Sequence, residues 1–324
     1  MNEINEMISI DLAKIGMPKD RSSRDPVIRN PHWTMIHERA TGRKFTNFFP
    51  SKDKMVEPTC ELIQMWKDQG KPVQRIRCDN AGENKKLEER LRSADWKMGD
   101  IKFEYTSSYT PQQNSRVEKG FETIFNRGRA MLVAANVPEK KRYLFAKEAF
   151  GTATMLDDLT VVEFKGKEQC RVRHWGEEVP SIVHSLKPWG WAGVVKTKRK
   201  SYAKLNNRGT VMMMVGYAKD HTGDCYRMYC DETKRVHVTR DVRWLDRMFF
   251  SKEGCPDLRS NGAEEDHNDE SDSEDEDEEE EGNIAQVNPQ PAIQQPRAQS
   301  RSNVTQEGSS SGVRTRSQAA SSGE

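Results

Sequence analysis

Two carboxylates in this sequence stand where rigid elements are expected to begin or end. Asp79 follows an apolar run at residues 73–78 that predicts a buried strand. Glu118 stands in the first turn of a predicted amphipathic helix, and 38 residues separate it from Asp79. A third candidate, Asp11, ends a short apolar strand at residues 7–10. Side chains on the ends of rigid elements can be held in the fixed geometry that catalysis requires.

Three such carboxylates in a basic domain are what two-metal phosphoryl transfer requires. We expect Asp11, Asp79 and Glu118 to be both catalytic residues and metal ligands, with Mg²⁺ or Mn²⁺ preferred over zinc because the ligands are hard oxygens. Two ions roughly 3.5–4 Å apart would activate a water or a DNA 3′-hydroxyl and stabilise the leaving oxygen. The sequence therefore indicates an enzyme that acts on a nucleic-acid backbone.

Each acid also has an ordinary structural explanation. Asp79, taken alone, is typical of a turn or a helix cap. Glu118, taken alone, is typical of an exposed glutamate in a first helical turn. Asp11 has unremarkable neighbours in a short strand, so its assignment depends on the other two. Glu83 and Glu104 are expected to be structural.

The first half of the chain predicts an α/β layer with a mixed sheet. The Glu118 helix is expected to start at Asn114 and to bury one face over about twenty residues. Its apolar face comprises Val117, Phe121, Ile124, Phe125, Gly128, Met131 and Leu132. The other expected elements are strands at 7–11, 33–39, 44–49, 73–78 and 101–105 and helices at 51–68, 84–96 and 138–156, with Ser51 as a cap.

The second half changes to short strands separated by turn signals, which predicts a small β-barrel or sandwich. These strands are expected at residues 192–197, 210–217, 225–230 and 236–242. We expect a catalytic core at residues 1–157, an irregular connector at 158–180, a β-domain at 181–250 and a tail at 251–324.

Charge separates the tail from the rest. Residues 251–324 carry 6 Lys/Arg and 18 Asp/Glu, whereas residues 1–250 carry 46 and 33. The tail, with 14 acidic residues in 264–281 and then a Pro/Gln/Ser-rich stretch, is expected to be disordered. The basic remainder is expected to attract phosphate backbones.

Six cysteines without framework spacing, no CxxC pair and no signal peptide predict an intracellular protein, nuclear or cytoplasmic, with no membrane partner.

Several polar side chains are candidates for nucleic-acid contact, each with an ordinary alternative. Gln112, Gln113 and Asn114 are candidates for DNA contact. Capping and loop roles explain these three residues as well as DNA contact does, and Asn114 is the expected helix cap. Solvated charge explains Lys119 and Arg127 on the Glu118 helix. A charged turn explains Lys198 and Arg199 in a basic segment at residues 196–200.

Two motifs carry a resemblance to a known family. Residues 77–83 read RCDNAGE and residues 109–119 read YTPQQNSRVEK. They resemble the "RSDNGGE" and "YTPQQNGVAER" segments of the integrase region of copia-type retrotransposon Pol polyproteins, and Ile10-Asp11-Leu12 is similar to the strand with the first catalytic aspartate. The stretches His174–Gly190 and 215–241 resemble the segments that follow in that family, so the resemblance covers about residues 7–247.

The resemblance implies a ribonuclease-H-like core with a mixed five-stranded sheet flanked by helices, followed by an SH3-like β-barrel. It also implies DNA integration as the activity, by 3′-end processing and strand transfer. The partners would then be DNA, as element ends and target, within a homo-oligomer and without a small-molecule substrate. Integration requires entry into the nucleus.

Departures from the family pattern define a second hypothesis. Ser115-Arg116 stands in place of Gly-Val, His37-Glu38 in place of a paired aspartate, and Asp157-Asp158 in place of Asn-Arg. The zinc, protease and reverse transcriptase modules do not occur in this sequence, as expected of an excised or decaying copy. The second hypothesis is a catalytically inactive remnant that serves as a DNA-binding or scaffold module. A cellular ribonuclease-H-type nuclease is disfavoured by the attached β-domain.

Overall fold

A computed structural model describes residues 3–19, 28–107, 114–196, 208–218, 221 and 224–252 of the chain. All of these residues belong to one compact unit, Met1–Glu280. The tail beyond residue 252, which the sequence predicts to be disordered, lies outside the described residues.

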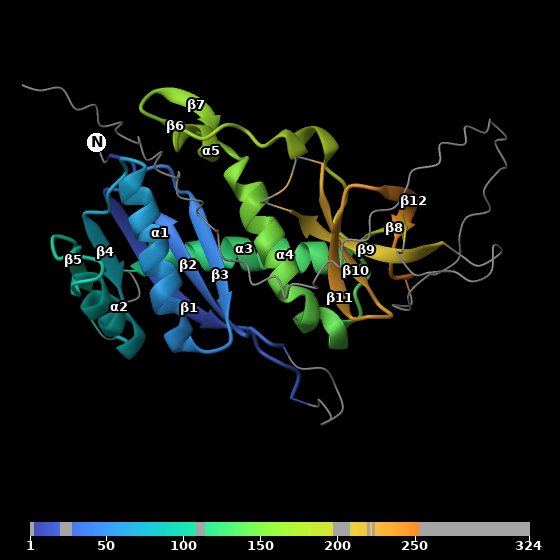
Figure 1. Cartoon of the computed structure of the whole chain (residues 1–324), viewed down its shortest axis with the longest axis horizontal. Helices are drawn as coiled ribbons and strands as arrows, with labels where there is room; N and C mark the ends of the chain where they lie inside the picture. Colours follow the sequence, from blue (N-terminus) through green and yellow to red (C-terminus); the bar gives the residue numbers. More distant parts are fainter. Residues whose placement is uncertain are drawn as a thin grey trace, which may run out of the picture. The chain divides into compact units, whose positions relative to one another are not determined.

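The first half of the chain forms a mixed five-stranded sheet flanked by helices (Figure 1). Its strands run in the order β3-β2-β1-β4-β5, with β1 antiparallel to β2 and parallel to β4. Parallel neighbours need a crossover, which α2 supplies between β4 and β5. This is the predicted ribonuclease-H-like arrangement. The elements are β1 (Met7–Lys14), β2 (His32–Glu38), β3 (Lys44–Phe49), η1 (Lys52–Met55), α1 (Val56–Asp68), β4 (Arg75–Cys78), α2 (Gly82–Arg92) and β5 (Lys102–Tyr105).

Side-chain alternation along β1 and β2 gives the sheet two different faces. One face buries Ile8, Ile10 and Ile36 in a cluster with α1 and α2. The opposite face presents Trp33 and Met35 to α3 (Ser115–Ala134). Because the period of a strand is two, every second residue of β1 points toward α3, and Asp11 is among them.

A second sheet follows α4, and all of its strand pairs are antiparallel. Its order is β11-β10-β9-β8-β12, in agreement with the predicted small β-domain. The sequence missed β12, because the four expected strands ended at residue 242. The elements are η3 (Glu139–Lys141), α4 (Arg142–Asp158), η4 (Ser181–Ser185), β8 (Trp191–Lys196), β9 (Gly209–Tyr217), β10 (Tyr226–Cys230), β11 (Arg235–Thr239) and β12 (Val242–Met248).

One continuous hydrophobic cluster joins the two sheets through α4. It extends from Trp33 in the first sheet to Phe250 after the second. The Thr152 hydroxyl of α4 donates to the Val215 carbonyl of β9 at 3.3 Å. The predicted division at residue 157 stays a prediction, and the residues on both sides of it share this core.

The segment expected to be an irregular connector has regular structure. It forms a hairpin of β6 (Val161–Phe164) and β7 (Lys167–Cys170), followed by the short helix α5 (Arg171–His174). The expectation of irregularity was wrong because these strands are four residues long, too short for the alternation pattern to stand out.

Two local expectations on the helices were also wrong. Ser51 and Asn114 do precede η1 and α3, but neither side chain makes a capping hydrogen bond. Phe125, predicted on the buried face of α3, is 49% exposed. Phe125 follows the buried Ile124 and therefore lies at the edge of the apolar face of α3. Whether a residue at this edge is buried depends on how far the packed elements extend around the helix.

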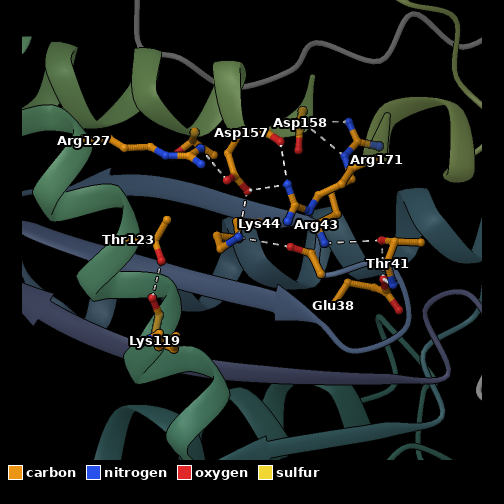
Figure 2. A network of polar contacts seen from close by, with 12 residues as sticks. Glu38, Thr41, Arg43, Lys44, Lys119, Thr123, Arg127, Asp157, Asp158 and Arg171 are labelled. Carbon is orange, nitrogen blue, oxygen red and sulfur yellow. Dashed lines mark hydrogen bonds and ion pairs between the residues drawn. The ribbon is translucent and has the colours of Figure 1, made fainter. Parts of the chain in front are cut away.

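A buried carboxylate at the end of α4 gathers cations from three other elements (Figure 2). The side chain of Asp157 is 1% exposed. It accepts a hydrogen bond from Lys44 of β3 at 2.7 Å and from Arg127 of α3 at 2.6 Å, and Arg171 of α5 lies 3.4 Å away. A buried charge is tolerated only when it is paired in this way. Asp157 therefore holds β3, α3 and α5 at the end of α4.

The neighbouring Asp158 extends the same network. Arg43 donates to Asp158 at 3.3 Å and to Glu177 at 2.8 Å. The Asp157-Asp158 pair departs from the family pattern, and the structure gives both carboxylates cationic partners. This departure is therefore built into the fold and is poor support for a decaying copy.

We expect Asp157→Asn to lower the free energy of unfolding by about 3 kcal/mol, because it leaves three cations around an uncharged, buried side chain. Urea denaturation followed by circular dichroism would measure this. Glu122→Gln is the matched control, since it removes an exposed carboxylate of α3 that pairs with Lys119 at 3.4 Å. Its stability should stay close to that of the wild type, and equal losses in both variants would contradict the role of Asp157.

Candidate active site

The register between β1 and β4 brings Asp11 beside Asp79. These parallel strands pair Ile8 with Ile76 and Ser9 with Arg77. Two residues after Ser9 stands Asp11, in the middle of β1, and two residues after Arg77 stands Asp79, just beyond the end of β4. Asp11 is the antiparallel partner of Met35, so its carboxylate belongs to the face that α3 covers. The charge of Asp79 acts on it from beyond the end of the neighbouring strand.

Glu118 reaches this face from the first turn of α3. Two residues after it comes Gly120, where a Cβ would stand 3.4 Å from Cγ of Met35. The missing side chain therefore lets the helix approach β2 closely. Met35 is the antiparallel partner of Asp11. The start of α3, with Glu118, is thus packed over the strand pair that carries Asp11.

The acids act on one another electrostatically. Burial, together with the negative charges of Asp79, Glu118 and Glu83, raises the pKa of Asp11 from 3.8 to about 6. A hydrogen bond from the backbone N–H of Leu12, at 2.7 Å, lowers it. These side-chain charges are all negative, so these acids repel one another.

Two of the acids have local partners that fix their positions. The Asn84 amide, 3% exposed in the first turn of α2, donates to Oδ1 of Asp79 at 2.6 Å. Glu83 pairs with Lys52 at 3.3 Å. Glu118 forms no hydrogen bond or ion pair with any residue that the structure describes, so its carboxylate is free to meet a ligand from outside the described chain.

The donor chemistry fits a hard divalent cation, because carboxylate oxygens are its preferred ligands. Within the described ranges, however, no three His, Cys, Asp or Glu side chains lie close enough together to hold an ion. Asp11 and Asp79 each turn one oxygen to a local donor, Leu12 or Asn84. As it stands, the site is an acidic cluster whose side chains must turn inward to complete a metal site.

Two residues near the cluster were missed by sequence reasoning. Asn84 had a usable signal, since it lies five residues after Asp79 at the start of a helix. His37 lies two residues after Met35 on β2 and therefore on the same face of the sheet. Its ring lies 3.6 Å from where a Cβ of Gly120 would stand. Burial, followed by the charges of Lys44 and other nearby cations, lowers the pKa of His37 to about 4. The ring is therefore neutral at neutral pH.

The candidate nucleic-acid contacts have mixed outcomes. Gln112, Gln113, Lys198 and Arg199 lie outside the described residues. Lys119 is exposed and pairs with Glu122 at 3.4 Å. Arg127 donates to Asp157 while 42% of its side chain stays exposed. Asn114 is only 7% exposed, which leaves little of its side chain for a phosphate. Nucleic-acid contact stays a prediction for each of these residues.

Sequence comparison finds relatives among retroelement polyproteins. Residues 190–257 match the family model of the retroviral polymerase SH3-like domain. Over 181 residues, or 54% of this chain, the sequence is 29% identical to the retrovirus-related Pol polyprotein from transposon TNT 1-94 of Nicotiana tabacum. The matched region spans 12% of that polyprotein.

Structural comparison finds distant likeness to integrases. A chain of the simian T-cell lymphotropic virus intasome in complex with PP2A regulatory subunit B56 gamma is 12% identical with a TM-score of 0.36, and the match covers 75% of this chain and 78% of that one. The HTLV-2 integrase catalytic core domain in complex with magnesium, in its dimeric form, is 14% identical with a TM-score of 0.33, covering 52% and 92%. Likeness at this level places no site on the present chain.

The strand order and the second antiparallel sheet define a ribonuclease-H-like core followed by an SH3-like domain. The chain is similar to a retrotransposon Pol polyprotein, and the resemblance to the copia-type integrase region is confirmed. No helix within the described residues is long and apolar enough to span a membrane.

Asp11→Asn tests the repulsion within the acidic cluster directly. The folded state raises the pKa of Asp11 from 3.8 to about 6, so the wild type loses stability as pH rises through this interval. Without divalent cations, we expect the asparagine variant to be more stable than the wild type at about pH 8, by about 1–3 kcal/mol. The difference should vanish below about pH 4, where the carboxyl is protonated in both folded and unfolded states.

Urea denaturation across this pH range measures both free energies of unfolding. A wild type more stable than Asp11→Asn at about pH 8 would contradict the acidic cluster, because Asp11 would then have a compensating partner.

Proposed function

We propose that this chain is a metal-dependent polynucleotidyl transferase of the retrotransposon integrase kind, which processes DNA 3′ ends and joins them to target DNA. The observation that carries this proposal is the packing of the start of α3, with Glu118, over the strand pair that carries Asp11, beside the strand whose end leads into Asp79. The raised pKa of Asp11, whose causes include the charges of Asp79 and Glu118, agrees with this arrangement. The three acids come from the middle of one strand, from just beyond the end of another and from the first turn of a helix, and their charges act on one another.

Asp11, Asp79 and Glu118 would hold the Mg²⁺ or Mn²⁺ ions. When bound, such ions supply an activated attacking oxygen and neutralise charge at the phosphorus. Asn84 would keep Asp79 in position through its 2.6 Å hydrogen bond. Gly120 would keep α3, and with it Glu118, close to the sheet. The chain's own contribution is thus a preorganised set of negative charges.

The proposed substrate is DNA, as element ends and as target. Residues 1–250 carry 46 Lys/Arg against 33 Asp/Glu, and this excess positive charge attracts phosphate backbones. The proposal includes a catalytic core at residues 1–157 and a β-domain at 181–250, assembled as a homo-oligomer that acts in the nucleus.

A catalytically inactive DNA-binding or scaffold module is the alternative function. The observation in its favour is that no three potential ligands among the described residues are close enough to hold an ion. The two functions differ in whether added Mg²⁺ draws the carboxylates together.

The test is joining of a short labelled DNA end to a plasmid target, with the full chain and Mg²⁺. We expect Asp79→Asn and Glu118→Gln to reduce joining by at least about 100-fold while both variants still bind DNA. Glu104→Gln, which removes a carboxylate paired with Arg77 at 2.7 Å on the same sheet, is the matched control and should stay active.

Equal joining by the wild type and by both acid variants would rule out the assigned site. A wild type that binds DNA and joins none, with either Mg²⁺ or Mn²⁺, would favour the inactive module.

A further inference from the structure

A groove with a volume of about 1330 Å³ adjoins the acidic cluster along α3. Ala13, which lines it, follows Asp11 by two residues on β1. Phe121 and Phe125, on the opposite wall, follow Glu118 by three and seven residues on α3. These spacings keep residues on one face of a strand and on one face of a helix. The groove therefore continues the surface that carries the acids.

Aromatic rings line this groove. The ring of Trp33 meets that of Phe121 edge-on at 4.6 Å and that of Phe150 at 4.9 Å. Phe125 joins the group at 5.6 Å from Phe150, and 49% of its surface is exposed. Met17, also lining the groove, is 37% exposed. A large exposed ring that extends a buried aromatic cluster offers a rigid stacking face.

The rim of the groove is cationic. Lys14 and Arg129 are both exposed, and neither forms an ion pair with a residue that the structure describes. The lining has five cationic side chains and two acidic ones: Lys14, Arg129, Lys140, Lys141 and Arg142 against Glu122 and Glu139. The occupant is thus expected to combine flat apolar groups with negative charge.

We propose that this groove binds an unpaired stretch of DNA strand, with a base stacked on Phe125 and phosphates beside Lys14 and Arg129. Ring faces next to cations are the features that bind single-stranded nucleic acid without sequence preference. A duplex hides its base faces in the stack, so it would leave the ring of Phe125 unused. The volume exceeds the roughly 300–1,000 Å³ of a small-molecule pocket, so more than one nucleotide fits.

This inference rests on the proposed function only in that the strand in the groove leads to Asp11 and Glu118. The groove places the unpaired strand on the side of the acidic cluster where the chain leaves β1 and continues to Met17. Its role is to hold a frayed strand end, and this role requires no chemistry at the acids.

Fluorescence anisotropy with the full chain in EDTA tests the groove apart from catalysis. The probes are a labelled oligothymidylate of about ten nucleotides and a blunt duplex of the same length. We expect Phe125→Ala to weaken single-strand binding about tenfold, through lost stacking, and to leave duplex binding unchanged. Phe125→Tyr keeps a ring and should bind as the wild type does. Val133→Ala is the matched control, since Val133 is 48% exposed on the same helix and outside the groove.

Arg129→Gln provides a second test that does not depend on the aromatic cluster. It should reduce the slope of log affinity against log salt for the single strand by about 0.7, the loss of one phosphate contact. The control is Arg173→Gln, an exposed arginine of α5 outside the groove, which should leave the slope unchanged.

Photocrosslinking of 5-iodouracil DNA to the wild type removes any dependence on how variants fold. Crosslinks at Phe125 or Phe121 support the groove. The inference is overturned by crosslinks confined to the second sheet, by unchanged single-strand binding of Phe125→Ala, or by an equal loss of duplex binding. If the wild type binds the single strand but joins no DNA, the proposed function is contradicted and the proposed role of the groove is not.

Discussion

The buried charge of Asp157 constrains where α3, the helix that carries Glu118, can lie. A carboxylate with 1% exposure is stable only with close cationic partners, and here they come from β3, α3 and α5. Arg127 lies nine residues after Glu118, so its 2.6 Å hydrogen bond to Asp157 fixes α3 in register against α4. Gly128 adds to this constraint, because a Cβ there would stand 2.4 Å from Cδ1 of Phe150. The position of Glu118 over the sheet follows from these contacts.

The same helix connects a stable region to one that is electrostatically strained. In the second half of α3, Arg127 is paired with Asp157 of α4. At the start of α3, Glu118, Asp11 and Asp79 repel one another, and burial raises the pKa of Asp11 to about 6. A fold can hold such repulsion only because the packing elsewhere is firm. Under the proposed function, this repulsion is what would favour cations, and through them a phosphate backbone, before any substrate arrives.

Sequence patterns predicted the features that depend on local periodicity. The apolar run before Asp79 and the helical spacing after Asn114 placed two acids correctly on a strand end and in a first turn. The exposure of Phe125 could not be predicted from the sequence. Apolar residues recur at the same helical spacing whether they face a buried core or line an open groove. The partners of Asp157 are 30 to 113 residues away for its two shortest contacts, and no local pattern encodes such pairs. Asp11 was the weakest candidate by sequence. Its strand was expected to end at this residue, but β1 continues to Lys14, and the role of Asp11 in the site stays a prediction.

Whether the three acids share a cation can be observed directly. A crystal structure of the full chain grown with Mn²⁺, with anomalous differences recorded at the manganese edge, would locate any bound ion. The account predicts an anomalous peak in contact with Asp11, Asp79 and Glu118, with the side chains of Asp11 and Asp79 turned away from their present local donors. Carboxylates that keep those donors, with no peak among them at saturating Mn²⁺, would contradict the account.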